Sequence, residues 1–230
     1  MLAGLGGCGE RRPASVQIQN PYLGPMRIAV APALNFSGSR DFDPNAVADL
    51  MASELSFVDG VEVLPVSRVL AALAREGMPE VDSPAHALAI KEQLGVDGIL
   101  VFGVTEYDPY EPPVVGIAAQ LYGRRPSEGL AGIDPVLASR SASPLTLPAA
   151  APPDAPLAQV QRVYNAAHEP TVAAIREFAR VRGADKSPFG WRKYVVSQQQ
   201  YLRFCCHATI SELVQNGVCR APKVDEVDDG

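Results

Sequence analysis

The chain has 230 residues, of which 47% are hydrophobic and 20% charged, a composition typical of a globular protein that buries a core. Its net charge is −6, and residues 223–230 carry half of this charge, because one lysine stands there against four acidic residues. The sequence contains no run of basic residues, which argues against nucleic-acid binding. It also contains no apolar stretch of the about 18–20 residues that a membrane-spanning helix needs.

The first feature along the chain is Leu5-Gly6-Gly7-Cys8, a large apolar residue followed by two small residues and a cysteine. This order resembles the lipobox of bacterial lipoproteins, in which the cysteine thiol receives a diacylglycerol after cleavage of the preceding signal. We therefore predict lipidation of Cys8, with residues 1–8 as the remnant of a signal and residues 9–25 as a polar tether. Residues 1–7 contain no Lys or Arg and are too few for a complete signal, so either the start lies upstream or Cys8 is an ordinary thiol.

Residues 26–122 predict an α/β domain in which strands alternate with helices. A buried strand over 26–34 precedes a helix over 44–58, where Asp43-Pro44 supplies an N-cap and a proline at the first helical position. Further elements predicted from the pattern are a strand over 61–64, a helix capped by Ser67, a helix from Ser83-Pro84 to Gly95, and two strands over 96–104 and 114–122. We expect a small mixed sheet of about four strands that is covered by helices.

The remaining residues change in character. Residues 123–157 are rich in proline and alanine and predict an extended excursion without a core of its own. Residues 158–220 are predicted to complete the domain with helices over 156–165 and 170–182 and a long amphipathic helix over 189–216 that Gly217 could terminate. Residues 221–230 form an acidic tail.

A resemblance to a known type of domain covers residues 27–122. The motifs that carry it are Arg27-Ile28-Ala29-Val30-Ala31-Pro32 running into Asn35-Phe36-Ser37-Gly38, the strand over 61–64 followed by Ser67, and Ala89-Ile90-Lys91-Glu92-Gln93-Leu94-Gly95-Val96-Asp97-Gly98-Ile99-Leu100. The segment resembles the amino-terminal domain of TolB and the related domain of the envelope lipoproteins CsgG and LpoB. The resemblance implies a mixed α/β domain that binds partners in the bacterial envelope, without enzymatic activity and without a cofactor.

The cysteines and histidines suggest no metal site. Cys205, Cys206 and His207 are adjacent, but successive helix positions point about 100° apart, so the three side chains cannot converge on one ion. We expect Cys205 and Cys206 to be buried thiols beside a surface imidazole. In an oxidising compartment, a disulfide between Cys219 and either Cys205 or Cys206 is the alternative.

The best candidate for a binding surface is the turn between the two strands predicted over 96–104 and 114–122. Its carboxylates, Glu106, Asp108 and Glu111, could be interpreted as a catalytic acid and base, but a solvated turn is the simpler interpretation. Tyr107, Asp108, Tyr110 and Glu111 suit contact with a protein, because the tyrosines offer rigid aromatic area on a proline-rich loop.

The sequence therefore predicts a non-catalytic lipoprotein of the bacterial envelope, anchored by lipid on Cys8 and facing the periplasm, that binds a protein partner. A cytosolic regulatory or assembly module with the same fold is an alternative. A hydrolase or transferase with an unrecognised site is a further alternative, which the missing nucleophile–base pair disfavours.

Overall fold

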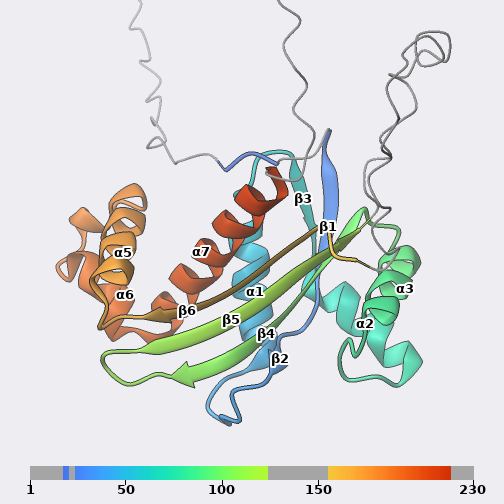
Figure 1. The fold of residues 1–230 in the computed structure, drawn as a ribbon, viewed down its shortest axis with the longest axis horizontal. Coiled ribbons are helices and arrows are strands. Elements are labelled where there is room, and N and C mark those ends of the chain that lie inside the picture. The colour runs from blue at the N-terminus through green and yellow to red at the C-terminus, as the bar shows by residue number, and fades with distance from the viewer. Residues whose placement is uncertain (1–17, 21–23, 124–154, 219–230) are drawn as a thin grey trace, which may run out of the picture.

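The computed structural model describes residues 18–20, 24–123 and 155–218, which form a mixed α/β fold around one sheet (Figure 1). The strands are β1 (Met26–Val30), β2 (Leu34–Asn35), β3 (Val61–Leu64), β4 (Gly98–Asp108), β5 (Val114–Gly123) and β6 (Ala158–Asn165). The main helices are α1 (Pro44–Leu55), α2 (Val66–Glu76), α3 (Pro84–Leu94), α5 (Glu169–Val181), α6 (Lys193–Val196) and α7 (Gln198–Val218). Two short 3-10 helices, η2 (Ala184–Lys186) and η3 (Gly190–Arg192), lie between α5 and α6.

The sheet has the strand order β3-β1-β4-β5-β6, and β2 pairs with β4 beside this path. β1 is parallel to both β3 and β4, whereas β4, β5 and β6 are antiparallel to one another. Parallel neighbours need a crossover, which α1 provides between β1 and β3, while a short hairpin joins β4 to β5. The predicted mixed α/β class is confirmed, but the sheet has six strands where about four were expected, because β2 and β6 also join it.

Helices cover the sheet on both faces. On one face, α1 and α7 pack over side chains such as Val30, Phe102 and Ile117 in the larger core cluster. On the opposite face, α2 and α3 pack over Ala29, Ile99 and Tyr122 in a smaller cluster. The two sets alternate along β1 and β4, because successive side chains of a strand point to opposite faces.

The local signals for two helix starts are confirmed. The Asp43 carboxylate accepts hydrogen bonds from the backbone N–H groups of Asn45 and Ala46, and Pro44 occupies the first turn of α1. Ser83 caps α3 in the same way through the N–H of His86. The predicted cap at Ser67 is wrong: α2 begins at Val66 after Pro65, without a side-chain cap.

Three predictions for the carboxy-terminal third are wrong. The segment predicted as a helix over 156–165 contains β6, in which Ala158, Val160 and Tyr164 are buried while Gln159 and Gln161 are exposed, an alternation with a period of two. The helix predicted over 189–216 is interrupted: η3 and α6 come first, Ser197 is extended, and α7 begins only at Gln198. α7 also continues through Gly217, which was expected to end it.

Candidate functional site

The hairpin between β4 and β5 exposes to solvent three of the four residues that were predicted from the sequence to bind a partner. Asp108, Tyr110 and Glu111 are exposed, and the Tyr110 side chain is among the most exposed large hydrophobic groups, with 76% of the residue accessible to solvent. The Asp108 carboxylate accepts a hydrogen bond of 3.0 Å from the Tyr110 backbone N–H, which fixes the turn. The hairpin thus exposes one aromatic ring and two carboxylates to solvent, and the hydrogen bond to Asp108 fixes the backbone that carries them.

The fourth residue, Tyr107, points toward the body of the domain. Its ring is half-buried against Phe42, with ring centroids 5.4 Å apart, and its hydroxyl accepts a hydrogen bond from the Gln198 side chain. Burial, together with the negative charge of Asp41, raises the pKa of the Tyr107 hydroxyl. Tyr107 therefore holds the hairpin against α7 and the loop before α1, and a direct role in partner binding stays a prediction.

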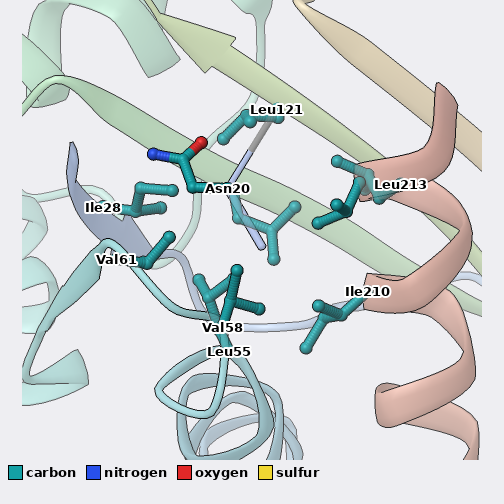
Figure 2. A pocket seen from close by; sticks show the side chains of 10 residues that line it. Asn20, Ile28, Leu55, Val58, Val61, Leu121, Ile210 and Leu213 are labelled. Carbon is teal, nitrogen blue, oxygen red and sulfur yellow. The ribbon is translucent and has the colours of Figure 1, made fainter. Parts of the chain in front are cut away.

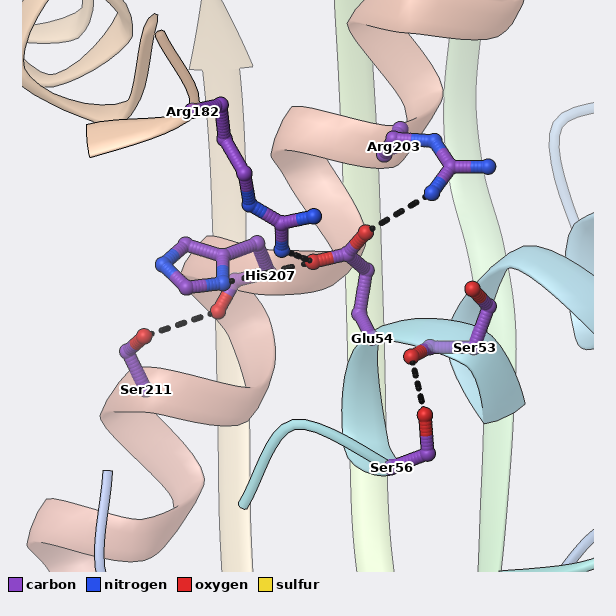
Figure 3. Close-up of polar contacts among 7 residues, drawn as sticks. All are labelled: Ser53, Glu54, Ser56, Arg182, Arg203, His207 and Ser211. Atoms are coloured by element: carbon purple, nitrogen blue, oxygen red, sulfur yellow. Dashed lines mark hydrogen bonds and ion pairs between the residues drawn. The ribbon is translucent and has the colours of Figure 1, made fainter. Parts of the chain in front are cut away.

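A second polar group lies inside the domain. We call Glu54, Arg182, Arg203 and His207 the Glu54 cluster (Figure 3). The Glu54 side chain comes from α1 and has no solvent exposure. It accepts hydrogen bonds from Arg182, at the end of α5, and from Arg203 of α7, the latter at 3.2 Å, and the His207 Nδ1 lies 3.4 Å from its Oε2. The cluster therefore joins three helices at one carboxylate.

Aromatic rings flank the cations of this cluster. The Arg182 guanidinium lies 4.3 Å from the ring centroid of Phe57 and 5.0 Å from that of Phe178. The His207 ring also contacts Phe178, at 4.7 Å between centroids, and the His207 side chain is only 27% exposed. The prediction of a surface imidazole beside the cysteines is therefore wrong, because the His207 side chain is largely buried against Glu54 and Phe178.

The Glu54 cluster was not predicted from the sequence, although one signal was present. Glu54 follows Val47, Leu50 and Met51 at helical spacing, on the stripe of α1 that packs into the core. A glutamate on such a stripe must be paired, because burying an unpaired charge is very costly. Its partners could not be inferred, since they lie 128 and 149 residues further along the chain.

The geometry of the Glu54 cluster is that of a structural ion pair. Both carboxylate oxygens are already engaged by guanidinium groups, which is the geometry of a charge-assisted structural contact. None of its members lines the apolar cavity between the sheet, α1 and α7 or the groove between α1 and α2 beside β3. The cluster therefore joins α1 to α7 and to the end of α5.

Cys205 and Cys206 are both buried free thiols, as expected. Burial raises the pKa of both, which disfavours the reactive thiolate. Among residues 18–20, 24–123 and 155–218, no group of three His, Cys, Asp or Glu side chains is arranged to hold a metal ion. Cys8 and Cys219 lie outside the described residues, so the predicted lipidation and the alternative disulfide stay predictions.

A small apolar cavity of about 30 Å³ lies between the sheet, α1 and α7 (Figure 2). Ile28, Leu55 and Val58 line it on one side, and Ile210 and Leu213 of α7 on the other. Its volume is enough for about one or two water molecules, but its lining is almost wholly apolar, with Asn20 at its rim. It is therefore a packing void rather than a ligand site.

These features define a helix-covered α/β domain with an exposed hairpin and a buried ion pair, in which no helix of the described residues is long and apolar enough to cross a bilayer. No protein-family model and no curated protein matches the chain. The solved structures that resemble it at low similarity include the following three. Lipoprotein GNA1162 from Neisseria meningitidis has 19% identity and a TM-score of 0.42, with 71% of this chain and 99% of that one covered.

The carboxy-terminal domain of LpoB from Salmonella enterica has 12% identity and a TM-score of 0.37, and the alignment covers 47% of this chain and 76% of that one. The hypothetical protein CT253 from Chlamydia trachomatis has 11% identity and a TM-score of 0.38, and here 83% of this chain and 98% of that one are covered. With TM-scores below 0.5, these likenesses assign neither a family nor an activity to the chain.

Proposed function

We propose that this protein is a non-catalytic lipoprotein of the bacterial envelope whose α/β domain binds a protein partner through the tip of the β4–β5 hairpin. The observation that carries the binding role is the exposure of Tyr110 on a turn that Asp108 fixes. A rigid aromatic side chain loses little conformational entropy when a partner covers it, so it is well suited to anchor an interface. The neighbouring carboxylates favour a partner surface that carries basic residues.

The proposed anchor is a lipid on Cys8, supported by the order Leu5-Gly6-Gly7-Cys8 and by the polar segment that follows it. Lipid chains would attach the domain to a membrane because each buried methylene contributes about 0.8 kcal/mol, so two or three chains hold a protein stably. On this proposal the domain faces the periplasm, where it meets its partner.

Fractionation of cells tests the anchor. The gene is expressed in a bacterium from its own upstream sequence, as the wild type, as Cys8→Ser and as Cys219→Ser, with and without globomycin. Lipid labelling and membrane association should be lost in Cys8→Ser and unaffected in Cys219→Ser, which controls for loss of a thiol. Wild-type protein found unlabelled in the cytosol would contradict the proposal and favour the cytosolic module.

In-cell crosslinking tests the hairpin. A photoreactive amino acid at position 110 should capture a defined protein, whereas the same probe at Phe189, which is also strongly exposed at 71%, should not. The capture should be lost when Glu111→Lys reverses the charge beside the probe. Equal capture from both positions, or capture that Glu111→Lys does not change, would exclude the hairpin as the binding surface.

A further inference from the structure

The edge of the sheet at β3 opens into a groove between two helices. The groove has a volume of about 500 Å³ and is lined by Asp49, Ala52 and Ser56 of α1, by Val63 of β3, and by Ser67 and Leu70 of α2. We call it the β3 groove. Because β3 is the last strand at this edge of the described sheet, the floor of the groove is a strand whose outer side has no neighbouring strand in the described part.

The backbone of β3 shows which residues present hydrogen-bonding groups to the groove. The Met26 N–H donates to the Gly60 carbonyl at 2.8 Å, so Gly60 faces β1. Successive residues of a strand point their N–H and C=O groups to opposite sides, so Val63 presents both of its groups to the outer edge. No described residue hydrogen-bonds to the Val63 backbone across this edge. An unpaired N–H and C=O at an open strand edge are a template for another strand.

The turn before β3 pairs with a short segment of the same chain. Gln19 forms a parallel bridge with Asp59, in which the Asp59 N–H donates to the Ile18 carbonyl at 2.9 Å and the Asn20 N–H donates to the Asp59 carbonyl at 3.0 Å. This bridge lies before β3, and no described residue continues the pairing to Val63.

The lining of the groove indicates the side chains that such a segment needs. Alternate residues of an added strand point toward α1 and toward α2. The α2 side offers Leu70, a half-buried apolar contact, whereas the α1 side offers the small residue Ala52 and the exposed carboxylate of Asp49. Asp49 is the only charged residue that lines the groove, so a basic side chain is the complementary partner.

We propose that the β3 groove binds an extended peptide segment of a partner protein, added alongside β3, with an apolar residue toward Leu70 and a basic residue toward Asp49. Main-chain hydrogen bonds to Val63 supply affinity, and the two side-chain contacts supply specificity. This surface is separate from the β4–β5 hairpin and does not depend on the lipid on Cys8.

The test uses the purified full chain and a displayed library of random ten-residue peptides. Selected peptides should share a basic residue and an apolar residue at neighbouring positions. Their affinity should fall at least tenfold in Val63→Pro, which removes the edge N–H. Gln161→Pro is the matched control, because Gln161 lies on β6 at the opposite edge of the sheet, and it should not change the affinity.

A charge exchange keeps the test decisive if Val63→Pro does not fold. Asp49→Lys should reject the selected peptide and accept a version whose basic residue is replaced by glutamate. Failure to enrich any peptide, or binding that neither Val63→Pro nor Asp49→Lys weakens, would overturn the proposal. Self-association of the wild type that Val63→Pro abolishes would assign the edge to a second copy of the chain and would also overturn it. None of these results depends on whether Cys8 is lipidated or Tyr110 binds a partner.

Discussion

Two ionic sites in this protein have opposite arrangements. In the Glu54 cluster, one carboxylate is surrounded by three basic side chains and has no solvent exposure. At the junction of α2 and α3, one histidine lies between two carboxylates: the His86 Nδ1 is 3.0 Å from Asp82 Oδ1 and its Nε2 is 3.1 Å from Glu76 Oε2. These carboxylates are 56% and 38% exposed.

This difference indicates that burial of the carboxylate, more than the number of its partners, determines how much an ionic site contributes to the free energy of unfolding. A buried charge that loses its partner stays desolvated, whereas an exposed one is solvated by water and screened by salt. The Glu54 cluster also joins segments far apart in the chain, while the His86 site joins two consecutive helices. We therefore expect unequal consequences when each site is disrupted.

The largest effect is expected for Glu54→Gln. The substitution leaves Arg182 and Arg203, whose side chains are 24% and 29% exposed, without their carboxylate, so the free energy of unfolding should fall by about 1–3 kcal/mol. Urea denaturation measures this change. Glu62→Gln is the control, because Glu62 forms an ion pair with Arg27 at 3.5 Å with 71% exposure, and it should change stability by less than about 0.5 kcal/mol. Equal effects of the two substitutions would contradict the structural role of the cluster.

A smaller effect is expected for His86→Gln. It removes the contacts to both exposed carboxylates, so the free energy of unfolding should fall by about 0.5–1 kcal/mol at low salt. In about 1 M NaCl most of this loss should disappear, while that of Glu54→Gln should persist, because salt screens exposed charges. Urea denaturation at the two salt concentrations compares the variants. A loss for His86→Gln that salt leaves unchanged would show that packing, rather than charge, dominates at this site.

The smallest effect is expected for Asp82→Asn and concerns how the stability of the protein changes at acidic pH. The Ser83 side chain and, next, His86 lower the pKa of the Asp82 carboxyl below its usual value of 3.8. A carboxyl group whose pKa is lower in the folded state stabilises the protein above its unfolded pKa, and this contribution is lost as pH falls through the folded value.

The expected result is that wild type exceeds Asp82→Asn in thermal stability at neutral pH and that the difference vanishes on acidification to about pH 3 or below. Thermal unfolding followed by circular dichroism over this range measures the difference. A difference that grows on acidification would reverse the predicted sign.

The predictions from sequence succeeded where one segment carried the whole signal. Asp43-Pro44 and Ser83-Pro84 placed two helix starts correctly, because capping involves only a few adjacent residues. They failed where a segment's state depended on a distant neighbour. Residues 158–165 form a strand because β5 offers an antiparallel edge to pair with, and this edge could not be seen in the segment alone.

The candidate sites also differ in whether they could be predicted from a single segment of the sequence. The hairpin with Asp108, Tyr110 and Glu111 followed from the local pattern of strand, turn and strand. The Glu54 cluster and the β3 groove did not, because each is assembled from elements that only packing brings together.

The amino-acid order alone was enough for the class of fold, for the starts of α1 and α3 and for the exposed hairpin, since short-range physics specifies each of them. The strand state of β6, the break before α7 and the inward position of His207 depend on partners remote in sequence. The same holds for Glu54, whose arginines lie 128 and 149 residues away. A buried carboxylate in the sequence requires a counter-charge, but only the packing of α1 against α5 and α7 selects which one it receives.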